Sequence, residues 1–173
     1  MFGKVKMSLI AASLLVGQAG TSYAETTAYE LLVFEDTTQG RLITKGKVDK
    51  AMAMMTDAEK QPFQRANNHC VMMTMAKSFE LAIPSCDSAV DSASEARIRA
   101  RVGTLASEAA AEREALALSN RGVAKALSGD SLGAKNDFSL AMRRNETFNA
   151  FQANLQLLET KMSMSAPIAQ SGE

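Results

Sequence analysis

The sequence has few of the residues that interrupt helices or build most enzyme sites. It contains 3 Pro, no Trp, 1 His and 2 Cys among 173 residues. Proline breaks helices, so its scarcity favours a helical protein. A lone histidine cannot by itself build a multi-histidine metal site or a conventional triad. Glycine-rich phosphate loops and nucleophile motifs are also missing. We therefore predict no catalytic, cofactor-binding or metal-binding residues, and a protein that is not an enzyme.

The chain also lacks an excess of either charge and any long apolar run. Its 19 Lys and Arg balance 19 Asp and Glu, so it has no basic field to attract nucleic acid. Its 46% hydrophobic content argues against wholesale disorder. No run approaches the 18 apolar residues that would indicate a membrane helix. These features predict one domain, with no nucleic-acid partner and no stable membrane span.

The N-terminus has the three-part layout of a secretory signal peptide. Lys4 and Lys6 precede the uncharged apolar run 8–16, and the small-residue sequence Ser22-Tyr23-Ala24 follows. We expect cleavage after Ala24, which would remove residues 1–24 and place the protein in the periplasm or outside the cell. The alternative is a short N-terminal membrane anchor, although the run is about half the length of a membrane span.

Two stretches of the remaining chain share an internal spacing. Asn67–Val90 and Ser119–Met142 each have the pattern of two antiparallel helices joined by a short turn. Cys70 is followed at offsets of 12, 16 and 19 by Ala82, Cys86 and Ala89. The same offsets lead from Gly122 to Ala134, Phe138 and Ala141. A fixed spacing of this kind is typical of repeat architectures, in which small residues let two helices approach closely.

The second stretch resembles a tetratricopeptide repeat, a helical hairpin of 34 residues. The residues that carry the resemblance are Gly122, Gly129-Asp130, Ala134, Phe138 and Ala141. Asn67–Val90 is a weaker match, 46–58 is a partial one, and Ala150–Thr160 resembles a further first helix. The closing proline of the family is absent, with Ser94 and Glu146 in its place.

The resemblance implies an all-α fold. Antiparallel helical hairpins would stack over residues 25–162 as a short superhelix with a C-terminal capping helix. Residues 163–173 would form a flexible tail. An irregular helical bundle is the alternative interpretation of the spacing.

Two other segments do not follow the repeated spacing. The spacing between the two stretches includes an 18-residue insertion within Asp91–Glu114, which we expect to begin with a polar loop over 91–96. Residues 107–118 should be helical. The short apolar run Leu31–Phe34 fits a strand or a buried helix, and we predict a helix because no partner strand is evident.

The two cysteines are expected to form a disulfide. In a hairpin that turns at Lys77-Ser78, Cys70 and Cys86 lie at similar distances from the turn, on facing helices. An oxidising compartment would favour the bond. The alternative is a pair of free, buried cysteines that take the place of small residues.

Asn68, Asn120 and Asn154 occupy the same place in successive first helices. First helices of tetratricopeptide proteins line a concave groove that binds extended peptides or partner helices. The resemblance therefore implies that these asparagines bind the backbone of a protein or peptide partner, with Asn67 and Ser119 as weaker neighbours. The alternative is that they bond between adjacent repeats or to solvent.

The leading function is a non-enzymatic interaction or scaffold module whose partner is unknown. One rival is a copper-binding protein that uses Met52, Met54, Met55, Met72, Met73 and Met75 near His69. The same methionines are typical of helix packing. A second rival is a self-associating structural subunit, because two clear repeats are few for a solenoid and a homodimer could complete the stack. Glu108, Glu112 and Glu114 are interpreted as surface charge.

Overall fold

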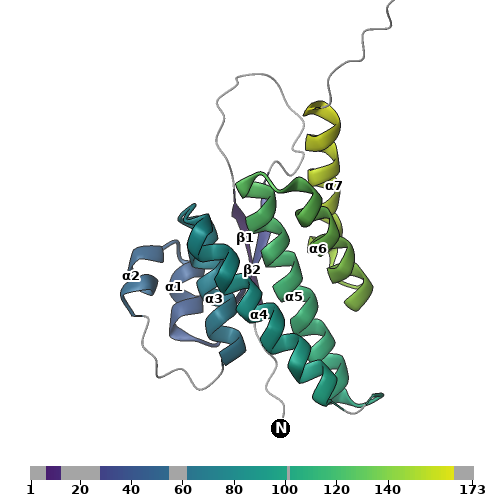
Figure 1. Cartoon of the computed structure of the whole chain (residues 1–173). Coiled ribbons are helices and arrows are strands. Elements are labelled where there is room, and N and C mark those ends of the chain that lie inside the picture. Colours follow the sequence, from purple (N-terminus) through teal and green to yellow (C-terminus); the bar gives the residue numbers. More distant parts are fainter. Residues whose placement is uncertain (1–6, 13–27, 55–61, 101, 166–173) are drawn as a thin grey trace, which may run out of the picture.

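The computed structural model describes residues 7–12, 28–54, 62–100 and 102–165. Helices dominate these residues, and the all-α prediction is confirmed (Figure 1). The helices are α1 (Thr38–Thr44), α2 (Val48–Ala53), α3 (Pro62–Met75), α4 (Phe79–Arg99), α5 (Leu105–Ser128), α6 (Ser131–Arg144) and α7 (Asn149–Ser165). Two short strands, β1 (Met7–Ala12) and β2 (Tyr29–Phe34), form an antiparallel pair.

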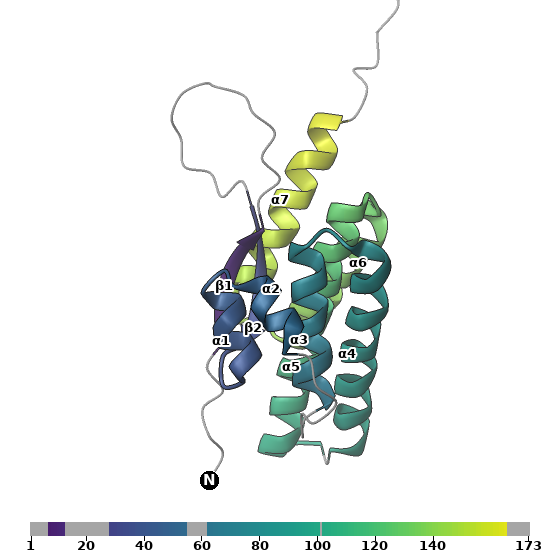
Figure 2. The ribbon, with the colours of Figure 1, turned by 90° about the vertical axis from the view of Figure 1, so that its left-hand side faces the viewer.

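The helices stack as antiparallel hairpins in layers. α3 pairs with α4, α5 pairs with α6, and α7 closes the stack. α3, α5 and α7 form the inner layer that contacts β2, and α4 and α6 form the outer layer (Figure 2). The strand pair therefore lies along one side of the helical stack.

The turns fall where the sequence indicated them. The first hairpin turns between Met75 and Phe79. In the second hairpin, Gly129 ends α5 with φ 99°, a left-handed conformation that suits glycine at a helix C-terminus. The carboxylate of Asp130 then caps α6 by accepting a hydrogen bond from the N–H of Gly133 at 2.8 Å. Gly129-Asp130 thus ends one helix and begins the next.

The insertion lengthens two helices and forms no long loop. α4 has 21 residues and α5 has 24, whereas α3 and α6 each have 14. The polar loop predicted over 91–96 is wrong, because these residues belong to α4. The extra residues of α4 and α5 pack against each other, and Gly103 lies in the turn between the two helices with φ 78°. The helix predicted over 107–118 is confirmed as part of α5.

The prediction of a helix at Leu31–Phe34 is wrong, because these residues lie in β2. The partner strand is β1, which falls within the segment that the sequence marked as a signal peptide. The other edge of β2 faces side chains, and no sequence pattern for strands detects such a neighbour. The rest of the predicted signal peptide, apart from β1, lies outside the described residues.

The C-terminal helix is longer than expected. α7 runs to Ser165, so the first residues of the predicted tail 163–173 are helical. Residues 166–173 lie outside the described part of the chain. Phe151 and Leu158 are buried and anchor α7 to the stack.

Small residues sit at the contacts between the paired helices. Ala82, Ala89, Ala134 and Ala141 are completely buried. A Cβ atom at Gly122 would lie 2.6 Å from the ring of Phe138, so the ring of α6 packs directly on the α5 backbone. The equivalent positions of the first hairpin are Cys70 and Cys86, which are joined by a disulfide. The repeated spacing therefore marks one close contact in each hairpin.

Candidate functional site

The most distinctive polar arrangement in the described structure is a row of three buried asparagines. Asn68 lies on α3, Asn120 on α5 and Asn154 on α7, with exposed fractions of 0, 0 and 1%. Their equivalent positions in the sequence place them at one level of the inner layer. They all point at β2, and we call them the asparagine row.

Each carboxamide binds both main-chain polar groups of one residue. The side-chain oxygen accepts from the N–H, and the side-chain nitrogen donates to the carbonyl. The pairs are Asn154 with Glu30 at 2.7 and 2.9 Å, Asn120 with Leu32 at 2.9 and 2.8 Å, and Asn68 with Phe34 at 3.1 and 3.3 Å.

This geometry follows from the period of a strand. Main-chain groups of alternate residues point to the same edge, about 6.6–6.8 Å apart. The axes of neighbouring packed helices are about 8–10 Å apart. The ends of side chains that converge on one strand can lie closer together than the axes, so they can match the spacing of alternate residues. A carboxamide carries one acceptor and one two-hydrogen donor, so it can replace the peptide group of a neighbouring strand. The asparagine row therefore acts as the strand that β2 lacks on this edge.

A second set of side chains joins the members of the row. Asn67 donates to the carbonyl of Leu32 at 3.0 Å and accepts from Asn120 at 2.9 Å. Ser119 Oγ lies 3.3 Å from the Nδ2 of Asn154, which donates to it. Asn67 and Ser119 therefore connect adjacent first helices, as the alternative interpretation of the sequence required. The side-chain amides of Asn67 and Asn120 thus bind the backbone of β2 and also bind each other.

The C-terminal end of β2 is fixed by Thr37 and Gly40. Thr37 Oγ1 donates to the carbonyl of Phe34 at 3.0 Å and accepts from the N–H of Gly40 at 2.8 Å. The side chain of Asn68 also donates to Thr37 Oγ1, at 2.9 Å. A Cβ at position 40 would lie 1.7 Å from the oxygen of Phe34, so only glycine fits this approach. The strand and the start of α1 are therefore built as one unit.

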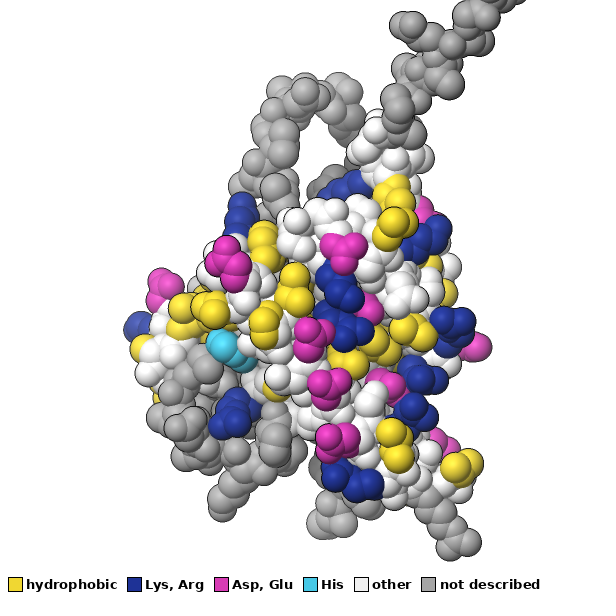
Figure 3. Space-filling model, viewed as in Figure 1, with side chains coloured by type: hydrophobic (Ala, Val, Ile, Leu, Met, Phe, Trp, Pro, Cys, Tyr) yellow, Lys and Arg dark blue, Asp and Glu magenta, His cyan; other side chains and the backbone are white. Residues whose placement is uncertain are grey.

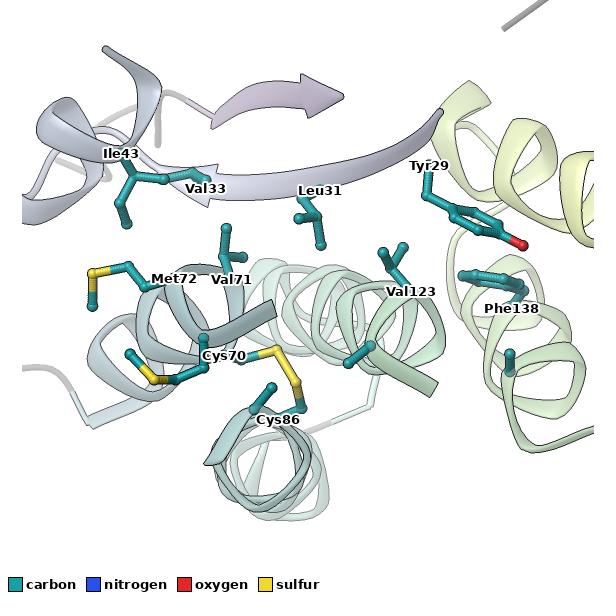
Figure 4. Close-up of a cluster of buried hydrophobic side chains, with 14 of the residues drawn as sticks. Tyr29, Leu31, Val33, Ile43, Cys70, Val71, Met72, Cys86, Val123 and Phe138 are labelled. Carbon is teal, nitrogen blue, oxygen red and sulfur yellow. A yellow bond between two sulfur atoms is a disulfide. The ribbon is translucent and has the colours of Figure 1, made fainter. Parts of the chain in front are cut away.

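Both faces of β2 are covered by apolar side chains. Tyr29, Leu31 and Val33 face one buried cluster, which includes Val71, Val123 and Phe138 (Figure 4). Leu32 and Phe34 face a second cluster on the other side of the strand. The Tyr29 and Phe138 rings stack with centroids 6.1 Å apart, and burial raises the pKa of the Tyr29 hydroxyl. The Nζ of Lys161 lies 4.5 Å from the centroid of the Tyr29 ring.

The structure thus brings together all three asparagines that the sequence singled out. They hold an extended backbone, and that backbone belongs to the chain itself. Binding of a separate partner by these three side chains stays a prediction. Any external peptide in the same position would have to replace β2.

The two cysteines are joined as predicted. Cys70 on α3 and Cys86 on α4 form a disulfide with a Cα–Cα distance of 4.8 Å, and both are fully buried. The bond lies behind Val71, on the side of α3 that faces α4 (Figure 4). It ties the outer layer to the helix that carries Asn68, and so supports the asparagine row from behind.

Two ion-pair clusters are not evident from sequence patterns, because each assembles from three helices. Asp137 of α6 is fully buried and bonds to Arg121 and Lys125 of α5 at 2.8 and 2.9 Å. Arg121 also bonds to Asp87 of α4 at 2.9 Å. Burial alone lowers the pKa of Arg121, but the bonds and charges of Asp137 and Asp87 outweigh it and raise the pKa. The surrounding face shows basic and acidic side chains interleaved (Figure 3).

Glu114 belongs to the second cluster, so its interpretation as surface charge is wrong. Its side chain is 6% exposed and pairs with Arg97 of α4 and Arg144 of α6. Ser94 donates to the same carboxylate at 2.8 Å. Both clusters clamp α5 between its neighbours, and they face away from β2.

The described structure places His69 and the methionines singled out with it in different surroundings. The Nδ1 of His69 lies 2.8 Å from Ser85 Oγ on α4, and burial lowers the pKa of the imidazole. Met72 and Met73 are buried in the apolar core, where their thioethers contact other side chains. Met52 and Met54 are exposed, and Met55 lies outside the described residues.

Among the described residues, no group of three or more His, Cys, Asp or Glu side chains is placed to hold a metal ion. Within the same residues, no helix has the length and apolar character needed to cross a membrane.

The asparagine row is therefore the candidate site, as an arrangement that recognises the main chain of an extended segment. Comparison with known proteins adds no assignment: no family model, no curated protein and no solved structure matches this chain.

Proposed function

We propose that this chain is a non-enzymatic protein–protein interaction module of the tetratricopeptide type. It would act in the periplasm or outside the cell, after cleavage at Ala24. The observation that supports this proposal is the asparagine row, which binds an extended main chain with two hydrogen bonds per residue. Because these bonds go to the backbone, they recognise an extended conformation and not one sequence, and they hold β2 of the chain itself in that conformation.

The rest of the architecture fits a rigid platform for such binding. The buried disulfide between Cys70 and Cys86 fits an oxidising compartment. The two ion-pair clusters hold α5 against α4 and α6, so the inner layer has little freedom to change its spacing. A fixed spacing is what a row of carboxamides needs in order to match the period of a strand.

Site-specific photo-crosslinking in the native host tests the proposal. A photoreactive residue at Asp36, which is exposed and follows β2, samples the strand side of the molecule. The matched control is the same residue at Leu132, which is 76% exposed on the outer helix α6. We expect a defined protein adduct from position 36 and not from position 132. If neither position gives an adduct above background, the chain is not an interaction module of this kind.

A further inference from the structure

The two edges of β2 are satisfied in different ways. The asparagine row binds the main-chain groups of Glu30, Leu32 and Phe34. The N–H and C=O groups of successive residues in a strand point to opposite edges. Those of Tyr29, Leu31 and Val33 therefore point to the other edge of β2. That outer edge carries a row of main-chain donors and acceptors, and a neighbouring strand pairs such a row.

In this structure β1 occupies the outer edge. It pairs antiparallel with β2, in a register that sets Ser8 opposite Val33 and Ile10 opposite Leu31. Figure 4 shows β1 on the side of β2 that faces away from α3 and α5. Yet β1 lies inside residues 1–24, the segment predicted to be cleaved from the exported protein. Cleavage would remove β1 and leave the outer edge of β2 open.

We propose that the outer edge of β2 is a strand-addition site, which residues 7–12 cover until cleavage after Ala24 opens it to an extended segment of a partner protein. The proposal rests on the proposed function and names the place where the partner binds. Strand addition to an open sheet edge is a common mode of peptide recognition. Here the receiving strand is already fixed on its other edge and on both faces, so it needs no rearrangement to accept a partner.

The occupant seen here indicates the chemistry of the partner. β1 has the sequence MSLIAA, an uncharged strand of small and aliphatic residues. Glu35 and Asp36 follow directly after β2, and an antiparallel partner would begin near that end. We therefore assign the site to an uncharged aliphatic strand of about six residues with a Lys or Arg just before it. The chain itself places Lys4 and Lys6 ahead of β1 in sequence.

The test uses the protein as exported by its native host, with its N-terminus determined by mass spectrometry. The probe is a fluorescent synthetic peptide, KVKMSLIAAS, which reproduces residues 4–13. Two variants of the peptide carry one N-methyl group each. N-methylation at Ile10 blocks an N–H that faces β2, whereas N-methylation at Leu9 alters an N–H that faces away. The two variants are matched in size and hydrophobicity.

We expect an N-terminus at Glu25 and saturable peptide binding by fluorescence anisotropy. Methylation at Ile10 should weaken binding by about tenfold or more, because it removes a hydrogen bond and adds a clash. Methylation at Leu9 should change the affinity by less than about threefold. Glu35→Gln should weaken binding of the unmodified peptide by about two- to fivefold, as loss of a surface charge pair would.

Several results would overturn the proposal. These are retention of residues 1–24 in the exported protein, equal affinity of the two methylated peptides, absence of peptide binding, or a dimer in solution whose second copy covers the edge. If the peptide fails to bind and position 36 still gives a crosslinked partner, the interaction function survives and only the strand-addition site is lost. If both experiments fail, the proposed function fails with it.

Discussion

Removal of one carboxamide from the asparagine row should cost an amount that depends on how deeply its target is buried. In Asn120→Ala, the N–H of Leu32 loses its acceptor and Asn67 Oδ1 loses a donor. The carbonyl of Leu32 keeps the bond from Asn67. Each of these two buried groups left without a partner costs about 1–3 kcal/mol, so we expect a loss of about 2–6 kcal/mol in the free energy of unfolding.

The variant Asn154→Ala provides the internal comparison. Its main-chain target, Glu30, is only partly buried, so water can replace those two bonds, and the one buried group that loses a donor is Ser119 Oγ. We expect a loss of about 1–3 kcal/mol. Asn136→Ala, at an exposed position in the middle of α6, is the matched control and should stay within about 0.5 kcal/mol of the parent protein.

The assay is urea denaturation followed by far-ultraviolet circular dichroism, with the m-value as a check that the folded state is unchanged. The order of destabilisation should be Asn120→Ala, then Asn154→Ala, then Asn136→Ala. Asn120→Asp adds a second check, because a carboxylate accepts from Leu32 but cannot donate to its carbonyl. Equal losses for Asn120→Ala and Asn136→Ala would refute the view that the row replaces a neighbouring strand.

Three further predictions concern the support of the site. Reduction of the Cys70–Cys86 bond should lower the free energy of unfolding by about 3 kcal/mol in urea titrations with and without reductant, and a double alanine variant should not respond to reductant. Gly122→Ala should lower it by about 1–3 kcal/mol, because the new methyl group would overlap the ring of Phe138; an unchanged midpoint would contradict that packing. Burial lowers the pKa of His69, so the unfolded chain binds more protons below about pH 6.5 and stability should fall as the pH drops through that value. His69→Gln should flatten this pH dependence, as measured by stability at pH 8, 7, 6 and 5.

The helical hairpins were predictable because their signals are local. Glycine at 129 ends a helix, an aspartate follows as a cap, and small residues recur where paired helices touch. These requirements act over a few turns of helix, so one sequence displays them. The disulfide was predictable in the same way, since Cys70 and Cys86 lie at similar distances in sequence from a turn that the sequence indicates.

The strand and the ion pairs were not predictable in this way, because their partners are distant in sequence. Leu32 bonds to an asparagine 88 residues away. No local sequence pattern indicates that side chains will bind the backbone of a strand. The sequence did place Asn68, Asn120 and Asn154 at equivalent positions, but it could not show that the chain itself supplies the segment they bind. Glu114 was misinterpreted for a similar reason, since Arg97 and Arg144 come from two other helices.

The bond between Asn154 and Glu30 has a consequence for the order of folding. It joins residues 124 positions apart, whereas each helical hairpin closes over a short stretch of chain. Contacts between distant residues form late, because a long loop must close before they stabilise anything. β2 precedes all of the helices in the sequence and is therefore the segment that docks last, once α7 has folded and packed. Until then the apolar side chains of β2 have no core in which to bury, and they are exposed to chaperones in an extended form.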